Sequence, residues 1–283
     1  MPLQFHLALL VLAAAAIHAT WNAVLKASGE RFLTFAVVAA TGTGLGILAA
    51  PFVDLPEAAT WPFLIASTLI HNGYFVFLIL AYRHGDLSQV YPLVRGTAPL
   101  AVTVLAMFFA GEVPNSTGLA GITLVSLGII SLMFVGGRPR NADLTPILLA
   151  LATALSIAVY TVVDGLGMRR AATPWGYIVW LNILEGIPFM IGVAILRPRE
   201  IGPFLRSRWK IDVFGGVLAV TAYAIVLYAL AQGAMAHVSA LRETSVLFAA
   251  VIGVVVFGEP LGWRRVACAA AIVAGMIVLQ VSG

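Results

Sequence analysis

Apolar residues run through the chain in long blocks, and the polar residues between them fall in short clusters. Each block is about 20 residues long, which is the length that an α-helix needs to cross a hydrocarbon core. A segment in lipid must satisfy its own backbone hydrogen bonds, so helices are the expected form. The pattern predicts an all-α integral membrane protein with ten transmembrane helices, near residues 3–25, 32–53, 61–82, 87–109, 116–135, 144–164, 175–196, 211–231, 236–257 and 263–281.

Composition supports a membrane protein and excludes a soluble domain. Only 10% of the residues are charged and 61% are apolar, whereas a soluble domain carries about 25% charged residues. The net charge of +4 does not indicate nucleic-acid binding, because the basic residues lie in loops between spans. The single cysteine, Cys268, can form no intramolecular disulfide and is expected to pack. The first apolar block lacks a positively charged start, so we interpret it as a helix and not as a signal peptide.

Two segments of the chain resemble each other. Residues 85–114 and 233–261 both carry an Arg-x-Thr element and end in a Gly-Glu pair. The alignment places Arg95 on Arg242, Thr97 on Thr244, and Gly111-Glu112 on Gly258-Glu259. A repeat of five helices is odd in number, so its second copy must enter the membrane from the other side. We therefore expect two inverted five-helix repeats within one membrane domain, residues 1–138 and 139–283, with a substrate site near mid-membrane between them.

The loop charges predict an orientation. Twelve of the sixteen Lys and Arg residues fall in the loops on one side, most densely in residues 197–210, and only Arg169 and Arg170 fall on the other. Positively charged loops stay in the cytoplasm. This rule places both termini outside, in the periplasm of a bacterial inner membrane.

The paired Arg-x-Thr and Gly-Glu elements, the ten helices and the five-plus-five repeat resemble the EamA-type transporters of the drug/metabolite transporter superfamily. The resemblance covers nearly the whole chain. It implies a bacterial inner-membrane carrier, usually an exporter of amino acids, other metabolites or drugs. We expect a monomer or homodimer that needs no cofactor. Such carriers are often drawn with cytoplasmic termini, so the loop charges disagree with the family on orientation.

The sequence favours a carrier of carboxylate or zwitterionic metabolites, and several of its features bear on alternative functions. The stretches HATWNAVLK and YPLVRGT resemble a subgroup associated with phosphonate utilisation, which suggests uptake or exchange of phosphonate-type or drug-like solutes. An enzyme is not expected, because the sequence has no HExxH, GxSxG or metal-spaced Cys/His motif, and no nucleotide-binding loop supports ATP coupling. A channel is disfavoured because no filter-like loop repeats.

Arg95 is the foremost candidate for the substrate site. An arginine inside a span costs roughly 2.5–3.5 kcal/mol and so faces a cavity or the bundle interior. Pro92 and Pro99 flank it, and together with Gly96 they predict a kink or local opening of the fourth helix at the arginine. Tyr91 shares its helical face. The arginine could clamp a substrate carboxylate or phosphonate, or it could tie an acidic side chain between helices.

Three further charged residues are candidates. Arg242 is expected on one face with Ser245, either at the site or reaching toward the membrane interface. The adjacent Glu243 need not pair with it. Glu185 lies deep in the seventh helix, as a proton-coupling residue or, slightly favoured, as the fixed partner of Arg95 or Arg242.

Polar and aromatic residues recur at helical spacing on five helices and could together line a cavity. The predicted substrate-binding residues are Arg95, Tyr91, Trp21, Asn22, His18, His71, Tyr74, Tyr160, Tyr223, Arg242 and Ser245. The candidates for proton coupling are Glu185, Asp164 and Glu243, and the candidate hinges are Pro92, Pro99 and Pro188. Asp164 and Lys26 lie near predicted helix ends, where an interface position is expected. The two Gly-Glu pairs are expected to cap helices and not to take part in chemistry.

Overall fold

The structure is a computed structural model that describes residues 3–28, 30–135, 144–258 and 262–281. The described residues form helices and no strand, and ten of the helical segments are long and apolar enough to span a membrane. This confirms the predicted fold class. The helices are α1 (Phe5–Ser28), α2 (Arg31–Ala49), α3 (Trp61–His84), α4 (Leu87–Ala110), α5 (Ser116–Ser131), α6 (Thr145–Arg170), α7 (Pro174–Leu196), α8 (Pro198–Gln232), α9 (Met235–Arg242), α10 (Ser245–Phe257) and α11 (Trp263–Val281).

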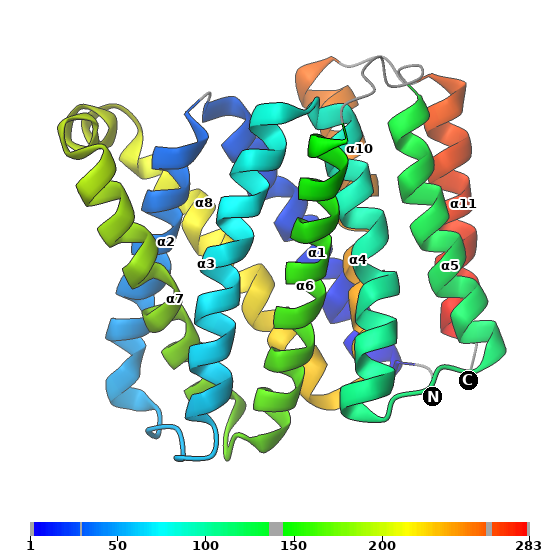
Figure 1. Ribbon diagram of the computed structural model, residues 1–283, viewed down its shortest axis with the longest axis horizontal. Coiled ribbons are helices and arrows are strands. Elements are labelled where there is room, and N and C mark those ends of the chain that lie inside the picture. Colours follow the sequence, from blue (N-terminus) through cyan, green and yellow to red (C-terminus); the bar gives the residue numbers. More distant parts are fainter. Residues whose placement is uncertain (1–2, 29, 136–143, 259–261, 282–283) are drawn as a thin grey trace.

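The eighth span is longer than predicted. α8 begins at Pro198 and has 35 residues, so the basic segment that we expected to be a loop is helical. A proline in the first turn suits a helix start, because its missing N–H has no partner there in any case. The first part of α8 lies across the upper left end of the bundle before the helix turns into the span (Figure 1).

The ninth span is broken, and the fourth is not. α4 continues through Pro92 and Pro99, so the expected opening at Arg95 is wrong. The break lies at the repeat-related position, where Glu243 and Thr244 separate α9 from α10. There the backbone forms bonds of the i to i+3 type, from Thr244 N–H to the Leu241 carbonyl and from Val246 N–H to the Glu243 carbonyl. Such a tight turn within a span is a common position for a hinge.

Helices of the two predicted halves interleave. α2 packs on α7 and α5 on α11, and these pairs join equivalent helices of the two halves. α3 packs on α6, and the equivalent helices of the other half, α8 and α1, also pack on each other. In the same way, α4 packs on α6, and α9 and α10 pack on α1. A repeated five-helix unit would give this reciprocal pattern. The largest interfaces therefore join the halves, so a rigid rocking of one whole half against the other would break them.

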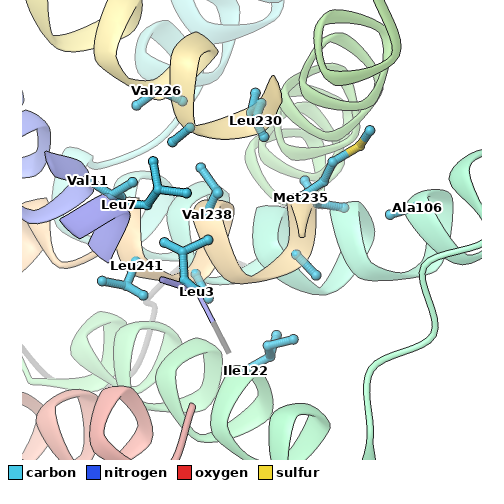
Figure 2. Packing of buried hydrophobic residues seen from close by; sticks show 14 of the residues in the cluster. Leu3, Leu7, Val11, Ala106, Ile122, Val226, Leu230, Met235, Val238 and Leu241 are labelled. Atoms are coloured by element: carbon cyan, nitrogen blue, oxygen red, sulfur yellow. The ribbon is translucent and has the colours of Figure 1, made fainter. Parts of the chain in front are cut away.

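The short helix α9 lies in the largest apolar core. All eight of its residues are buried, and Met235, Val238 and Leu241 pack among Leu3 and Leu7 of the N-terminal segment (Figure 2). Both chain termini lie at this end of the bundle, which we call the terminal end (Figure 1). The packing of α9 fixes the chain directly before Arg242 in place.

Glycines allow the closest helix contacts. A Cβ atom added to Gly275 of α11 would lie 2.7 Å from the Val125 nitrogen and 3.0 Å from the Gly121 oxygen on α5. Between α2 and α7, Gly46 and Gly186 lie equally close to the facing helix. Small residues at such crossings let membrane helices approach closely.

Gly275→Ala should therefore destabilise the protein. The added methyl group meets backbone atoms that cannot move aside, and we expect a loss of about 1–3 kcal/mol, seen as a lower melting temperature in detergent. Gly44→Ala is the matched control, because open space surrounds that position and alanine suits a helix better than glycine does. Equal melting temperatures for the two variants would contradict the proposed packing.

Candidate functional site

A cavity of about 160 Å³ lies among the helices near the middle of their spans. One water needs roughly 10–15 Å³ by this measure, so the cavity has room for a small organic molecule. Helices of both halves line it. The lining residues are Ala14, His18 and Trp21 of α1, Phe35, Val38, Ala39 and Gly42 of α2, His71, Tyr74 and Phe75 of α3, Arg95 of α4, Tyr160 of α6, Asn182, Glu185 and Gly186 of α7, Ala219, Val220, Ala222, Tyr223 and Val226 of α8, and Arg242 of α9.

Aromatic rings form two groups in the cavity wall. On one side Trp21 meets Phe35 edge to face at 5.8 Å, and Phe35 meets Phe75 at 5.3 Å. On the other side His71 stacks on Tyr160 with ring centroids 3.8 Å apart. Edge-to-face and stacked rings gain attraction beyond burial alone. The cavity is thus a rigid, mostly apolar space with few polar groups.

Arg95 is held by the second half of the chain. Its Nε atom lies 2.8 Å from the Glu243 Oε2 atom, and its Nη2 atom donates a 2.8 Å hydrogen bond to the Ser245 hydroxyl. The contact with Glu243 is an ion pair by distance, without the alignment of a hydrogen bond. The Arg95 Cζ atom lies over the Tyr91 ring, 5.9 Å from the ring centroid. Arg95 is therefore a tie between α4 and the α9–α10 turn that also reaches the cavity wall.

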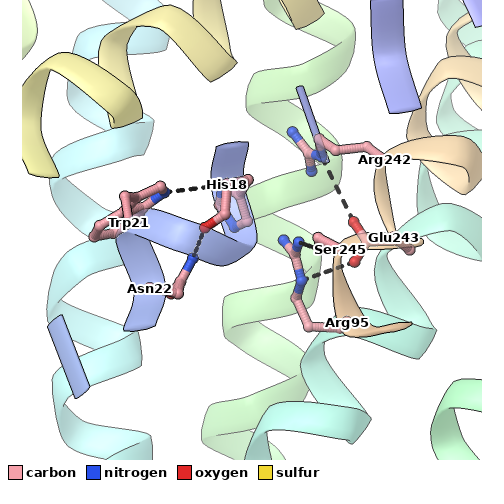
Figure 3. Close-up of polar contacts among 7 residues, drawn as sticks. All are labelled: His18, Trp21, Asn22, Arg95, Arg242, Glu243 and Ser245. Atoms are coloured by element: carbon pink, nitrogen blue, oxygen red, sulfur yellow. Dashed lines mark hydrogen bonds and ion pairs between the residues drawn. The ribbon is translucent and has the colours of Figure 1, made fainter. Parts of the chain in front are cut away.

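Arg242 is held less completely. Its Nε atom lies 3.6 Å from Glu243 Oε1, and its Nη2 atom is buried with no hydrogen-bond partner. Figure 3 shows the two arginines approaching Glu243 from opposite sides, with the Arg242 guanidinium extending away from α9. The side chain is only 5% exposed, so the possibility that it reaches the membrane interface is excluded. A buried charged donor without a partner is costly, so its presence calls for an acceptor.

The site has one carboxylate between two guanidinium groups. Glu243 is fully buried, and the position aligned with it in the first half is Gly96, which has no side chain to offer. Without a side chain at Gly96, α4 can lie against the Ser126 carbonyl of α5. The arginine is thus present in both similar segments, whereas the glutamate is present in one. Arg95, Arg242 and Glu243, which we call the triad, together carry one net positive charge beside the cavity.

Glu185 is not the fixed partner of either arginine, which corrects the favoured prediction. Glu243 takes that place. Among the described residues the Glu185 carboxylate has no ion pair and no hydrogen bond, and it lines the cavity from α7. The cavity therefore contains an acidic group in addition to the basic one.

Asp164 does not lie at the membrane interface as expected. It is fully buried in α6 and accepts hydrogen bonds from the hydroxyls of Tyr177, at 2.8 Å, and Tyr223, at 2.5 Å. α6 extends six residues past the predicted end of its span, to Arg170, which places Asp164 inside it. Lys26 is exposed near the end of α1, as predicted, with its ammonium over the Phe257 ring.

Most of the predicted substrate-binding residues come together at the cavity. Eight of them line it: Arg95, Trp21, His18, His71, Tyr74, Tyr160, Tyr223 and Arg242. Tyr91 and Ser245 lie behind the wall beside Arg95, and the Asn22 amide donates to the carbonyl of His18 within α1. The sequence analysis missed Phe35, Phe75 and Asn182, of which Asn182 could have been found because it lies one turn before Glu185.

The first Gly-Glu pair caps a helix, as predicted. Gly111 ends α4 with a left-handed φ of 67°. Glu112 then pairs with Arg169 and accepts a 2.7 Å hydrogen bond from the Met235 amide. These contacts join the two halves at the terminal end. Gly258 caps α10 in the same way, with a φ of 65°, and Glu259 lies outside the described residues.

Within the described ranges, no group of three or more His, Cys, Asp or Glu side chains could hold a metal ion.

Comparison with known proteins adds the family. Residues 144–281, which run from the start of α6 to the end of α11, match the EamA-like transporter family. The match thus covers the predicted second half of the chain. Over 88% of its length the chain is also similar to an uncharacterized transporter, YcxC, of Bacillus subtilis (strain 168), with 25% identity and 88% of that protein covered. The EamA match, this relative and the ten spans make the protein a multi-pass membrane transporter of the drug/metabolite type.

The fold agrees with a solved structure. A protein known from its crystal structure is similar over 98% of this chain and 99% of its own, with a TM-score of 0.81. The two sequences are 19% identical, so the likeness concerns the fold alone.

Glu243→Gln should strongly destabilise this EamA-like protein. It removes the one carboxylate that lies between two buried guanidinium groups, and breaking a buried ion pair in this way costs about 3–5 kcal/mol. The melting temperature in detergent measures the effect. Glu200→Gln is the control, because Glu200 pairs with Arg197 on the surface, where such a pair contributes about 0–1 kcal/mol. If Glu243→Gln melts within the range of that control, the triad does not hold the site together.

Proposed function

We propose that this protein is a secondary transporter of small zwitterionic metabolites with the charge pattern of an amino acid. The observation that carries the proposal is the buried Arg242 guanidinium, whose Nη2 atom has no partner and which lines an aromatic cavity at mid-membrane. A substrate carboxylate would supply the missing acceptor. Arginine suits this role because its planar fork can bind both carboxylate oxygens.

The anchor differs from the one that the sequence favoured. Arg95 already has a close ion pair with Glu243, at 2.8 Å, and a hydrogen bond to Ser245. Arg242 lies farther from Glu243, at 3.6 Å, and its Nη2 atom is buried without a hydrogen-bond partner. We therefore assign the substrate carboxylate to Arg242 and regard Arg95 as the group that fixes Glu243, with its charge adding to the positive potential of the cavity.

The second charge of the substrate has its own candidate partner. Glu185 lines the same cavity with a carboxylate that has no ion pair among the described residues. An ammonium group beside it would neutralise that charge. The rings of Trp21, Phe35 and Phe75 would cover the apolar part of the substrate, and their faces also attract cations.

Carriers of this kind work by alternating access. Because the largest helix interfaces join the two halves, the moving units would contain helices of both. The α9–α10 turn directly follows Arg242, so we propose it as a hinge that senses the substrate, ahead of Pro92, Pro99 and Pro188. Opening at the terminal end would require the contact between Glu112 and Arg169 to break.

The loop charges remain our basis for orientation. We propose that the basic start of α8 faces the bacterial cytoplasm and that the terminal end faces the periplasm. The family resemblance suggests export, whereas cotransport of substrate with a proton, as inferred below, would drive uptake.

Arg242→Gln should raise the KM for a zwitterionic substrate by about tenfold or more. The variant loses one hydrogen bond to a charged group, which contributes about 1.5–3 kcal/mol to binding. The measurement is counterflow of labelled amino acids into proteoliposomes that contain the unlabelled compound, which needs no ion gradient. The melting temperature of the variant shows whether it is folded. A folded Arg242→Gln protein with an unchanged KM would refute the anchor.

Glu185→Gln should change selectivity and leave the fold intact. The variant should lose affinity for the amino acid but keep its affinity for the deaminated carboxylate, because only the ammonium group loses its partner. Inhibition of counterflow by these two compounds measures both affinities. An equal loss of affinity for both compounds would show that Glu185 does not bind the ammonium group.

A further inference from the structure

Asp164 is a carboxylate that the proposed substrate site does not use. It is fully buried in α6, and its two oxygens are bound by different helices. Tyr177 of α7 donates to Oδ1, and Tyr223 of α8 donates to Oδ2. No ion pair involves Asp164 in the described part of the chain. A charge buried at this depth without a cation is expensive and marks a functional position in membrane proteins.

The two tyrosines lead in different directions. Tyr223 lines the substrate cavity. Tyr177 lines a second pocket, of about 10 Å³, between residues 54–57 and 171–176 at the terminal end. That volume corresponds to about one water molecule. Of the two tyrosines that bind Asp164, one therefore lines the cavity and the other lines the pocket at the terminal end.

The groups that face Asp164 come from each helix packed around α6. α3 contributes His71 and the Ser67 hydroxyl, and the His71 Nδ1 atom lies 3.0 Å from the Ser67 carbonyl. The same nitrogen lies 3.1 Å from the Ser67 hydroxyl, so the ring tautomer determines which of these two contacts is a hydrogen bond.

The remaining neighbours carry no further acid. α6 itself adds Tyr160 one turn away, which stacks on His71. Arg242 of α9 lies in the cavity wall beside Tyr160 and Tyr223. α4 has Arg95 as its single charged residue, and Glu243 binds it. In the described structure no arginine holds Asp164 in its charged form, and the same is true of Glu185 on α7, to which we assign the substrate ammonium group.

We propose that Asp164 is the proton-coupling site of the carrier. The carboxylate takes up one proton from the medium and becomes a neutral carboxylic acid, and it returns the proton on the other side of the membrane. Tyrosine hydroxyls can donate to the charged form and accept from the neutral one, so both states are satisfied. The inference rests on the proposed transport function but not on which residue anchors the substrate.

Tyr223 connects this site to the substrate. While Asp164 is charged, the Tyr223 hydroxyl donates to it and is not available to the cavity. When Asp164 is neutral, its own O–H can donate, and the Tyr223 hydroxyl is free to donate to a substrate oxygen. Protonation and substrate binding then favour each other, and such coupling is reciprocal.

The test drives transport with a pH gradient in proteoliposomes. For the wild type, a gradient of one pH unit should raise substrate accumulation by up to about tenfold, the limit for one proton per substrate. Asp164→Asn should lose this accumulation but keep counterflow. Asp212→Asn is the matched control: Asp212 is also fully buried, but it lies 3.8 Å from Arg208 in the basic first part of α8. It should keep the wild-type response.

A second measurement needs no variant. Substrate added to the purified wild type in weak buffer should cause proton uptake approaching one per molecule, seen with a pH indicator. Counterflow without any response to pH, or accumulation by a folded Asp164→Asn protein, would overturn the coupling role and leave the proposed transport function standing. Absence of counterflow with every zwitterion in the wild type would instead overturn the proposed function.

Discussion

Two arginines share one glutamate inside the membrane, and the rest of the site depends on that imbalance. Glu243 compensates one of the two charges that Arg95 and Arg242 bring into the bundle. The desolvation of an ion is costly and is repaid only by close partners. The triad therefore holds the helices together and at the same time leaves one positive charge for an anionic group. In our proposal, the same three side chains thus stabilise the fold and bind the substrate.

The surrounding structure keeps this arrangement in place. The break between α9 and α10 lies at Glu243 itself, so the chain turns where the carboxylate is needed. On one side of the break the fully buried α9 fixes Arg242, and on the other Ser245 accepts from Arg95. The glutamate has only Gly96 as its counterpart in the first half. The two similar segments of the sequence thus share the arginine but not the glutamate.

The sequence predicted much of this fold because its main signal is simple. Long apolar blocks fix the spans, and Gly111 and Gly258 fix two helix ends. The location of the helix break could not be predicted, because prolines in α4 suggested one at Arg95 while the tight turn at Glu243 depends on tertiary ion pairs. The partner of the arginines was also misassigned to Glu185. Pairing between helices depends on packing angles and register, and neither can be derived from residue spacing within one helix.

The most direct test of the central claim compares three ligands on the wild-type protein. An amino acid, the amine that lacks its carboxylate, and the carboxylic acid that lacks its amine are each titrated while the melting temperature is recorded in detergent. A ligand at 100 times its Kd stabilises a fold by about 2.7 kcal/mol. An unpartnered Arg242 and an unpaired Glu185 in one cavity predict that the amino acid stabilises most, the acid less and the amine least. Stabilisation by the amine that equals or exceeds that by the amino acid would contradict the account.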